Sequence, residues 1–340
     1  MMRTLTLTLL LIVTPAATPG QGNRYFTLNT TKVRPLAMGS AFTALGDALA
    51  AIQFNPAAYF PRPNNAIPRL TLFLNPVSPV VGGVNHEELF RGSGSLVDDT
   101  LLSLSLLLKS ISVNLNSVQL GFLLGEEGLY LPEMFFDERF VRVSGFRQNH
   151  THSLIGRLQL ADEVSVGASA NFLFGSAPGD PMKRRSDFGI SYGILLRPEK
   201  GLNIGVSFVN LPDSLADYRL PLERLVDESV NIGVAYEMFT KTLVSLDVRN
   251  LGEESNRIIR ELHLGVEQLI LTHLALRAGY FKKNSGEHVL SWGVGLLNDT
   301  LLFNSRNESS RNFYLNYAFV YEKSQDTDTR WHFLSFLIKI

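Results

Sequence analysis

The sequence contains no cysteine in 340 residues. This absence excludes disulfide bonds, thiolate metal sites, a cysteine nucleophile and a lipoprotein anchor. It also removes the covalent cross-links that commonly support a secreted soluble domain. The stability of the chain must therefore come from a large closed sheet or from a conventional core.

Neither sign of charge is in excess, because 31 basic residues face 32 acidic ones and the net charge is −1. The basic surface that binds nucleic acid is therefore missing, and no nucleic-acid partner is expected. The short basic cluster Lys183-Arg184-Arg185 follows a Pro-Gly-Asp-Pro sequence, and we predict that it lies in a solvated loop.

The sequence also lacks the motifs of common catalytic sites. It contains no Gly-Lys-Ser phosphate loop, no Gly-x-Ser-x-Gly nucleophile elbow and no His-Glu-x-x-His helix. The seven histidines do not show metal-ligand spacing. We therefore predict no catalytic residue, no metal and no cofactor, and we do not expect an enzyme.

Long apolar runs are confined to the N-terminus. Residues 1–22 combine Arg3, an apolar stretch at 5–13 and small residues after Pro15, which predicts a secretory signal peptide. No later stretch reaches the roughly 20 apolar residues of a helical membrane span. A membrane protein of this composition must be a closed β-barrel, the other structure that satisfies every backbone group in lipid.

Alternation with a period of two recurs along the chain and predicts an all-β protein. In residues 163–174, for example, apolar side chains alternate with Ser, Gly and Asn. Such small polar residues suit a confined lumen, and aromatic residues gather near the strand ends, as in membrane barrels. The predicted strands, about 14 in number, are 69–75, 118–125, 138–146, 152–160, 163–174, 187–197, 202–209, 229–237, 244–249, 262–267, 273–280, 290–296, 313–321 and 331–340.

The predicted connections alternate between short and long, as in outer-membrane barrels. The short ones are 161–162, 198–200, 238–241 and 271–272, and the long ones are 176–185, 211–225, 252–259, 282–287 and 304–311. Residues 76–117 are the least clear region. We expect residues 101–111 to form an amphipathic segment in a long first loop, although their Leu/Ser alternation also fits a strand.

The remainder of the chain is organised around residues 32–60, a stretch rich in Ala and Gly that contains Phe54-Asn55-Pro56-Ala57. Gly39, Gly46 and Pro56 make it a poor helix, and its many small residues suit a segment packed against other backbone in an enclosed space. The stretch resembles the N-terminal signature of the FadL superfamily of outer-membrane barrels, and its PorV-like branch in particular. The matching residues are Arg34, Met38, Gly39, Ala41, Phe42, Asp47, Phe54, Asn55, Pro56 and Ala57.

Two residues depart from the family pattern: Ser40 replaces its second glycine, and Asp47 alone remains of its acidic pair. The resemblance implies a transmembrane antiparallel β-barrel at 67–340 with an N-terminal plug, or hatch, at 23–66. It also implies passive transport of hydrophobic compounds, such as long-chain fatty acids, across the bacterial outer membrane. The hatch or gating residues that it indicates are Phe54, Asn55, Pro56, Ala57, Gly39 and Asp47.

Charged residues recur on the predicted inward faces of the strands, where an unpaired charge is costly. Their balanced signs favour ion pairs that also hold a plug, and a substrate path is the alternative. These residues are Arg157, Asp187, Glu237, Asp247, Arg249, Glu267 and Arg277. The C-terminal strand carries Trp331, Phe333 and Ile340, and strands of this kind are read by the barrel assembly machinery; Ile340 stands where Phe or Trp is more usual.

Two alternatives remain open at the level of sequence. The first is a PorV-like barrel that acts as a partner or anchor of secretion components. The second is a soluble secreted β-sandwich that acts as a binding module. The expected partners of the favoured reading are outer-membrane lipid, a fatty-acid-like hydrophobic molecule and the assembly machinery.

Overall fold

The computed structural model describes thirteen stretches of the chain. They are residues 23–27, 30–59, 69–77, 107–127, 149–177, 180–210, 228–239, 241–251, 260–271, 274–282, 288–296, 313–323 and 328–340. The predicted signal peptide at 1–22 lies outside these residues. None of the helices in the described stretches is long and apolar enough to cross a bilayer.

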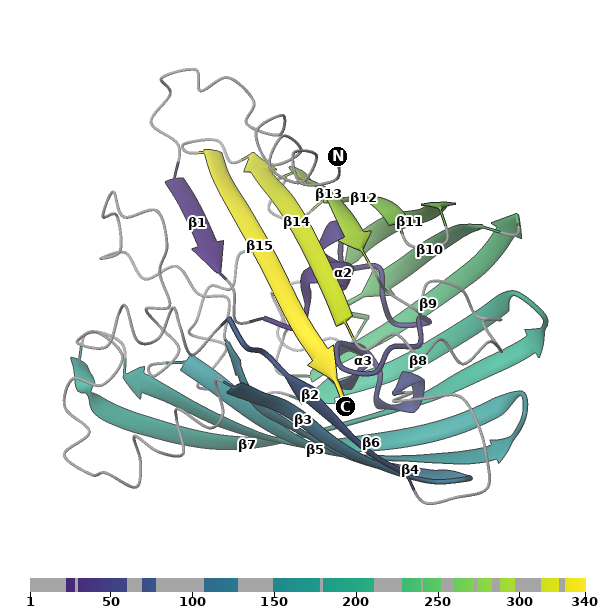
Figure 1. Ribbon diagram of the computed structural model, residues 1–340, viewed down its shortest axis with the longest axis horizontal. Helices are drawn as coiled ribbons and strands as arrows, with labels where there is room; N and C mark the ends of the chain where they lie inside the picture. Colours follow the sequence, from purple (N-terminus) through teal and green to yellow (C-terminus); the bar gives the residue numbers. More distant parts are fainter. Residues whose placement is uncertain are drawn as a thin grey trace, which may run out of the picture.

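The described strands form a single sheet that closes on itself as a transmembrane barrel (Figure 1). The strands are β1 (Asn23–Thr27), β2 (Arg69–Leu74), β3 (Leu108–Leu115), β4 (Val118–Glu127), β5 (Asn149–Ala161), β6 (Val164–Ala177), β7 (Asp180–Glu199), β8 (Leu202–Asn210), β9 (Glu228–Phe239), β10 (Thr242–Arg249), β11 (Glu261–Leu271), β12 (Leu274–Lys282), β13 (His288–Leu296), β14 (Phe313–Lys323) and β15 (Asp328–Lys339). Fourteen of them, β2 to β15, are antiparallel to their neighbours in chain order. The prediction of a barrel of about 14 strands is confirmed, and the soluble two-sheet sandwich is wrong.

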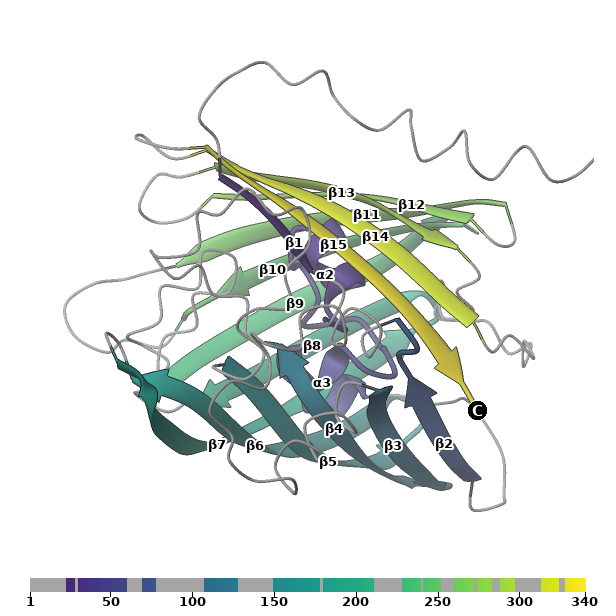
Figure 2. The same cartoon turned by 60° about the vertical axis from the view of Figure 1, so that its left-hand side comes forward.

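The barrel closes over a short seam between its first and last antiparallel strands. Ile338 and Lys339 of β15 pair with Leu74 and Phe73 of β2, and Leu72 exchanges two backbone hydrogen bonds of 2.9 Å with Ile340. Pro76 lies two residues after the end of β2, and because proline has no backbone N–H it cannot donate a hydrogen bond that would extend the pairing of β2 there. Further up the same edge of β15, residues 329–333 pair with β1, which runs parallel to β15 (Figure 2).

The two faces of the strands differ in composition and burial. On β7, Phe188, Ile190 and Tyr192 point outward and are 50–53% exposed, whereas Ser191 and Leu195 point inward and are 0–3% exposed. An outward apolar face satisfies the lipid around a barrel. The inward face encloses residues 30–59, which contain the short helices α2 (Val33–Ala37), α3 (Ala51–Phe54) and the 3₁₀ turn η1 (Pro56–Ala58); we call them the inner segment (Figure 1).

The structure corrects several predicted boundaries. Residues 108–115 are strand β3, not part of an amphipathic loop segment, and this strand makes up the count of 14, since the predicted strand at 138–146 lies outside the described residues. The predicted long loop at 176–185 is wrong: β6 continues to Ala177 and β7 begins at Asp180. Lys183-Arg184-Arg185 therefore belong to β7, not to a loop.

Two further differences concern the ends of the barrel and the predicted hatch. Residues 23–27, predicted as part of the hatch, form strand β1 in the sheet. The predicted long loop at 304–311 lies outside the described residues. Because antiparallel strands alternate in direction, the connection from β13 to β14 falls at the end of the barrel that carries the short turns, so short and long connections do not alternate throughout.

Candidate functional site

The inner segment follows a row of glycines on the inward face of the wall. An added Cβ at Gly265 on β11 would lie 2.6 Å from the Met38 carbonyl oxygen, and one at Gly279 on β12 would lie 2.5 Å from Gly39 Cα. Both distances are well below the roughly 3.5 Å of a normal carbon contact. Added Cβ atoms at further inward glycines would also touch the segment, namely Gly121, Gly167, Gly193, Gly205, Gly233 and Gly293. The backbone of the inner segment therefore packs directly on the backbone of the wall.

Local sequence sets the shape of this segment. Gly39 and Ser40 both adopt positive φ, 59° and 60°, directly after α2, and this conformation reverses the chain. Glycine adopts it readily, whereas serine does so at some cost. Ser40 is the residue that replaces a glycine of the FadL-type pattern, so its backbone here keeps the conformation for which that glycine is suited.

Asp47 and Asn55 fix the second half of the segment. The Asp47 carboxylate accepts hydrogen bonds from the backbone N–H groups of Leu49 and Ala50, at 2.8 and 3.0 Å. The Asn55 side chain accepts one from Ala57 N at 3.0 Å and so caps η1, whose first residue is Pro56. The Asn55 amide also donates to the carbonyls of Thr43, 2.9 Å away, and of Ile194 on β7, 3.2 Å away.

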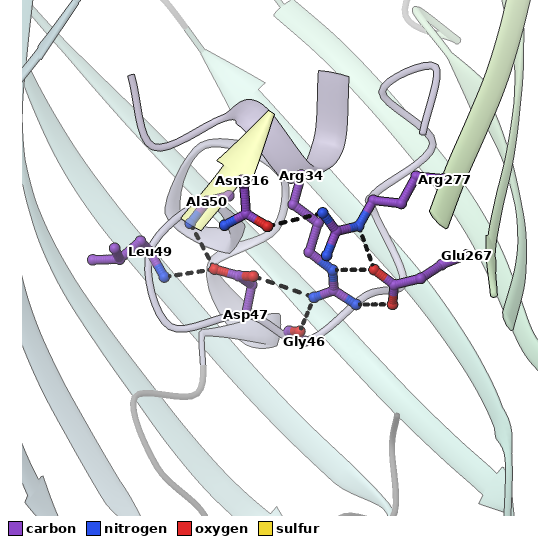
Figure 3. A network of polar contacts seen from close by, with 8 residues as sticks. All are labelled: Arg34, Gly46, Asp47, Leu49, Ala50, Glu267, Arg277 and Asn316. Carbon is purple, nitrogen blue, oxygen red and sulfur yellow. Dashed lines mark hydrogen bonds and ion pairs between the residues drawn. The ribbon is translucent and has the colours of Figure 1, made fainter. Parts of the chain in front are cut away.

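A buried ionic network joins the inner segment to β11, β12 and β14 (Figure 3). The Arg34 guanidinium donates to both oxygens of Glu267, at 2.8 and 2.9 Å, and contacts Asp47 at 3.2 Å. Arg277 donates to Glu267 at 2.6 Å and to Asn316 at 2.8 Å. Burial alone would lower the pKa of Arg34, but the carboxylates of Glu267 and Asp47 outweigh it and raise this pKa above its ordinary value. The network is balanced, with two guanidiniums and two carboxylates.

Two further wall charges bind the backbone of the segment. Asp247 on β10 is fully buried, and its carboxylate accepts hydrogen bonds from Phe42 N at 2.7 Å and Thr43 N at 2.8 Å. Arg249, two residues along the same strand, donates to the Ser40 carbonyl. Its guanidinium also lies 4.9 Å from the centroid of the Phe54 ring.

The far end of the segment is held by β5 and β6. Arg157 donates to the Ala57 carbonyl at 3.0 Å, and the Ser165 hydroxyl donates to the same oxygen at 2.9 Å. Leu195 of β7 packs against three alanines here, Ala51, Ala57 and Ala58. Small side chains on the segment are what allow this approach.

Glu126 on β4 holds the beginning of the segment and was not found from the sequence. It accepts hydrogen bonds from the Thr30 hydroxyl at 2.7 Å and from Thr31 N at 2.9 Å. The strand register shifts between Leu123 and Glu126, and Gly125 between them has a φ of 52°. This bulge changes the phase of the alternation and turns Glu126 inward, so a strict period of two cannot identify it.

The structure brings most of the predicted site residues together. Gly39, Asp47, Phe54, Asn55, Pro56 and Ala57 lie on the inner segment, and Arg157, Asp247, Arg249, Glu267 and Arg277 contact it from the wall. Glu237 is half-buried near the turn after β9, with its Cβ facing Gly201 rather than the segment. The side chain of Asp187 lies outside the described part of the chain. On β15, Trp331 and Phe333 point inward and are buried, whereas Ile340 is exposed.

Comparisons with known proteins bear on the fold. No family model matches the chain, and no curated protein matches it. The structure is similar to the crystal structure of the toluene transporter TbuX of Ralstonia pickettii, at 12% identity, over 92% of this chain and 98% of that one, with a TM-score of 0.50. A FadL homologue from Pseudomonas aeruginosa matches at 10% identity and a TM-score of 0.45, over 94% of this chain and 97% of that one.

At this level of identity the likeness to TbuX establishes the fold. The prediction of a transmembrane β-barrel is confirmed, and the barrel shares its fold with this transporter. No comparison singles out the PorV-like branch.

Proposed function

We propose that the protein mediates passive transport of hydrophobic compounds across the bacterial outer membrane, with the inner segment as its plug. The observation that carries the proposal is the position of this segment. It runs round the inside of the barrel and touches the wall from β4 to β14. A chain in this position obstructs the lumen, so a solute that uses the lumen must displace or bypass it.

The two faces of the barrel support a membrane location for this activity. The outward face is apolar along its strands, which suits a bilayer. The fold shared with a protein named as a toluene transporter supports hydrophobic compounds as the substrate class. Aromatic hydrocarbons and long-chain fatty acids are the substrates to test first. Delivery by the signal peptide and folding by the assembly machinery, with β15 as its recognition strand, belong to the same proposal.

The residues proposed to control the plug are those whose side chains tie several backbone groups at once. Asn55 is the principal one, because it joins Thr43, Ala57 and β7. Asp47 organises the turn before α3 and also contacts Arg34. Gly39 allows the reversal after α2, and Phe54, Pro56 and Ala57 surround Asn55. Loss of the Asn55 contacts is expected to loosen the plug without removing the barrel.

A reversible cross-link between plug and wall tests the proposal. An added Cβ at Gly233 lies 2.9 Å from Thr43 Cβ, whereas a disulfide needs about 3.8 Å between such atoms, and it lies even closer to Asp247 Oδ1. Thr43→Cys with Gly233→Cys therefore requires both the inner segment and the Asp247 side chain to shift, and folding of the pair is verified before transport is measured. Because the protein has no cysteine, this pair cannot form another intramolecular disulfide. We expect uptake of a labelled fatty acid or toluene into vesicles to stop when the pair is oxidised and to return on reduction.

Three controls make this experiment decisive. Each single-cysteine variant that shows the same heat-dependent shift in gel mobility as the unmodified protein should transport in both redox states, and only variants that pass this folding test are compared. If the double variant does not fold, Asn55→Ala is used instead, and faster uptake than in the unmodified protein is expected. Equal uptake by oxidised and reduced protein would show that the plug does not move during transport.

One observation favours a second function. The glycine row leaves no space between much of the inner segment and the wall, which also fits a permanently sealed barrel. Such a barrel would act in the PorV-like manner, as a membrane partner or anchor of secretion components. A folded barrel with no saturable binding or uptake of any hydrophobic compound, and with capture of a secretion component, would favour this function.

A further inference from the structure

A row of basic side chains lies on the outward face at the end of β12 to β15 opposite the short turns. Lys282 on β12 stands directly opposite His288 on β13, and His288 stands directly opposite Lys323 on β14. Arg330 on β15 faces Tyr321, the next outward residue along β14 from Lys323. We call Lys282, His288, Lys323 and Arg330 the cation row.

These side chains point away from the lumen. Lys282, His288 and Lys323 are exposed and Arg330 is half-buried, whereas their neighbours on the same strands are buried inside the barrel. Those inward neighbours include Phe281, Val289 and Trp331. The cation row is therefore on the lipid side of the wall and plays no part in holding the inner segment.

The arrangement of charge in the row calls for an anion. Lys282 and Lys323 stand on either side of His288, so two permanent cations lie two strands apart with an imidazole, and no acidic residue, at the position between them. Among the described outward residues at this end of β11 to β15, the one carboxylate is Asp328, opposite Lys323. One of its oxygens already accepts the Tyr321 hydroxyl at 2.7 Å. Within the described part of this face, three permanent cations and an imidazole thus share a single carboxylate.

Aromatic side chains lie directly below the row on the same face. Tyr280 Oη is 2.8 Å from His288 Nδ1, which orients the imidazole along the edge of the barrel. Further down, the ring of Trp292 packs against Tyr317 and Phe319, with centroids 5.5 and 5.7 Å apart. Aromatic belts mark the level where lipid headgroups meet acyl chains. The cation row therefore lies at headgroup level, and Leu290 and Trp292 lie at the level of the chains.

We propose that the cation row is a binding site for the phosphate of an anionic membrane lipid in the leaflet at this end of the barrel. The phosphate oxygens accept hydrogen bonds from Lys282, His288, Lys323 and Arg330, and the acyl chains pack on Leu290, Trp292 and Phe319. Charge complementarity and the aromatic belt below select a lipid over a free anion. The site is independent of transport, because it requires only that the barrel sit in a bilayer.

Tryptophan fluorescence provides a direct test, because the chain has two tryptophans. Trp292 faces lipid beneath the row, whereas Trp331 is buried inside the barrel. A Trp331→Phe background leaves Trp292 as the reporter, and the folded protein is reconstituted in vesicles that contain brominated phosphatidylglycerol or brominated phosphatidylcholine. At low salt we expect the anionic lipid to associate near Trp292 about fivefold more strongly, the effect of roughly one basic side chain near a membrane surface.

The decisive variant is Lys282→Gln with Lys323→Gln and Arg330→Gln. In this variant the preference for phosphatidylglycerol over phosphatidylcholine near Trp292 should disappear, to a ratio of about one. The matched control is Lys200→Gln with Lys241→Gln, two exposed lysines in the short turns, which should keep the full preference. Folding of each variant is verified by the heat-dependent gel shift. The proposal is overturned if the unmodified row shows no preference, if the triple variant keeps it, or if the control loses it equally.

Inorganic phosphate separates a lipid from a soluble ligand. Added at the same ionic strength as sodium chloride, it should reduce the preference no more than the chloride does. Loss of the preference with phosphate alone would identify a site for free phosphate and would overturn the assignment to lipid.

Discussion

The inward and outward faces of the same strands obey opposite rules. Inside, glycines and small or polar side chains let the backbone of the inner segment pack on the wall, and large side chains such as Trp331 and Phe333 are buried against α2. Outside, side chains are large and apolar and are about half exposed to their surroundings, as Ile190 and Leu154 are. Specific packing is therefore required on the inside of this barrel, whereas the outside requires only an apolar surface that suits lipid.

Glycine positions give the sharpest form of this comparison. Gly279 points inward, and an added Cβ there would lie within 2.5 Å of the inner segment. Gly156 on β5 points outward, and an added Cβ would meet only Leu120, at an ordinary 3.6 Å. The same substitution at the two positions is thus a direct measure of how differently the faces are packed.

The largest effect on refolding is expected from Gly279→Ala. The methyl group would collide with backbone of the inner segment, so the loss of unfolding free energy should be about 3 kcal/mol, the upper end of the usual cost of overpacking. We expect little or no heat-modifiable barrel on gels after refolding in detergent. Gly156→Ala is the matched control and should refold like the unmodified protein. Equal refolding of the two variants would mean that the inner segment does not pack on this wall.

The next effect concerns charge on the inward face. Glu267→Gln leaves Arg34 and Arg277 buried with one fewer carboxylate, and breaking a buried ionic network in this way costs about 3–5 kcal/mol. The free energy of unfolding is measured by urea titration of the protein in phospholipid vesicles, with tryptophan fluorescence as the signal. Glu237→Gln changes a half-buried carboxylate near a turn, and we expect a loss below about 1 kcal/mol. Comparable losses of unfolding free energy for the two variants would show that the Arg34 network does not anchor the inner segment.

The smallest difference is predicted for apolar residues on opposite faces of β7. Leu195→Ala opens a cavity beside Ala51, Ala57 and Ala58 and should cost about 2–4 kcal/mol. Ile190→Ala, on the outward face, exchanges contacts that lipid can replace, so its cost should be below about 1 kcal/mol. The same unfolding assay compares them, and a larger loss at Ile190 than at Leu195 would contradict the packing described here.

Much of the barrel was predictable, because strand alternation reports directly on two contrasting environments. The predictions were wrong in regions where the alternating residues do not differ clearly between a lipid-facing and a lumen-facing type. Residues 101–111 are predicted as an amphipathic loop segment because Leu and Ser alternate there next to a run of leucines, whereas residues 108–115 form strand β3. The sequence predicts ends of β6 and β7 that lie too far from the turn, because the Pro-Gly and basic residues there indicate a loop. In the structure β6 extends to Ala177 and β7 begins at Asp180.

The inner site was predictable in kind but not in detail. The small residues of 32–60 indicated tight packing on backbone, and the charges on inward faces indicated partners. The partners themselves could not be predicted, since Arg34 meets Glu267 across 233 positions of sequence. The inward position of Glu126 could not be predicted, because a bulge at Gly125 reverses the inward–outward alternation of β4. The parallel pairing of β1 with β15 could not be predicted either, because a strand of five residues is too short to show a periodicity.

The sequence by itself determined that the chain is built from strands, because apolar residues alternate with small or polar ones along each of them, and it favoured a membrane barrel with an N-terminal stretch packed in a confined space. That the sheet closes on itself was decided by the tertiary structure. Only the tertiary structure decided which charges meet, where the inner segment rests and how the seam is shared between β1 and β2. The physical reason is that alternation is a local property of a strand, whereas register, bulges and ion pairs depend on contacts between residues far apart in the chain.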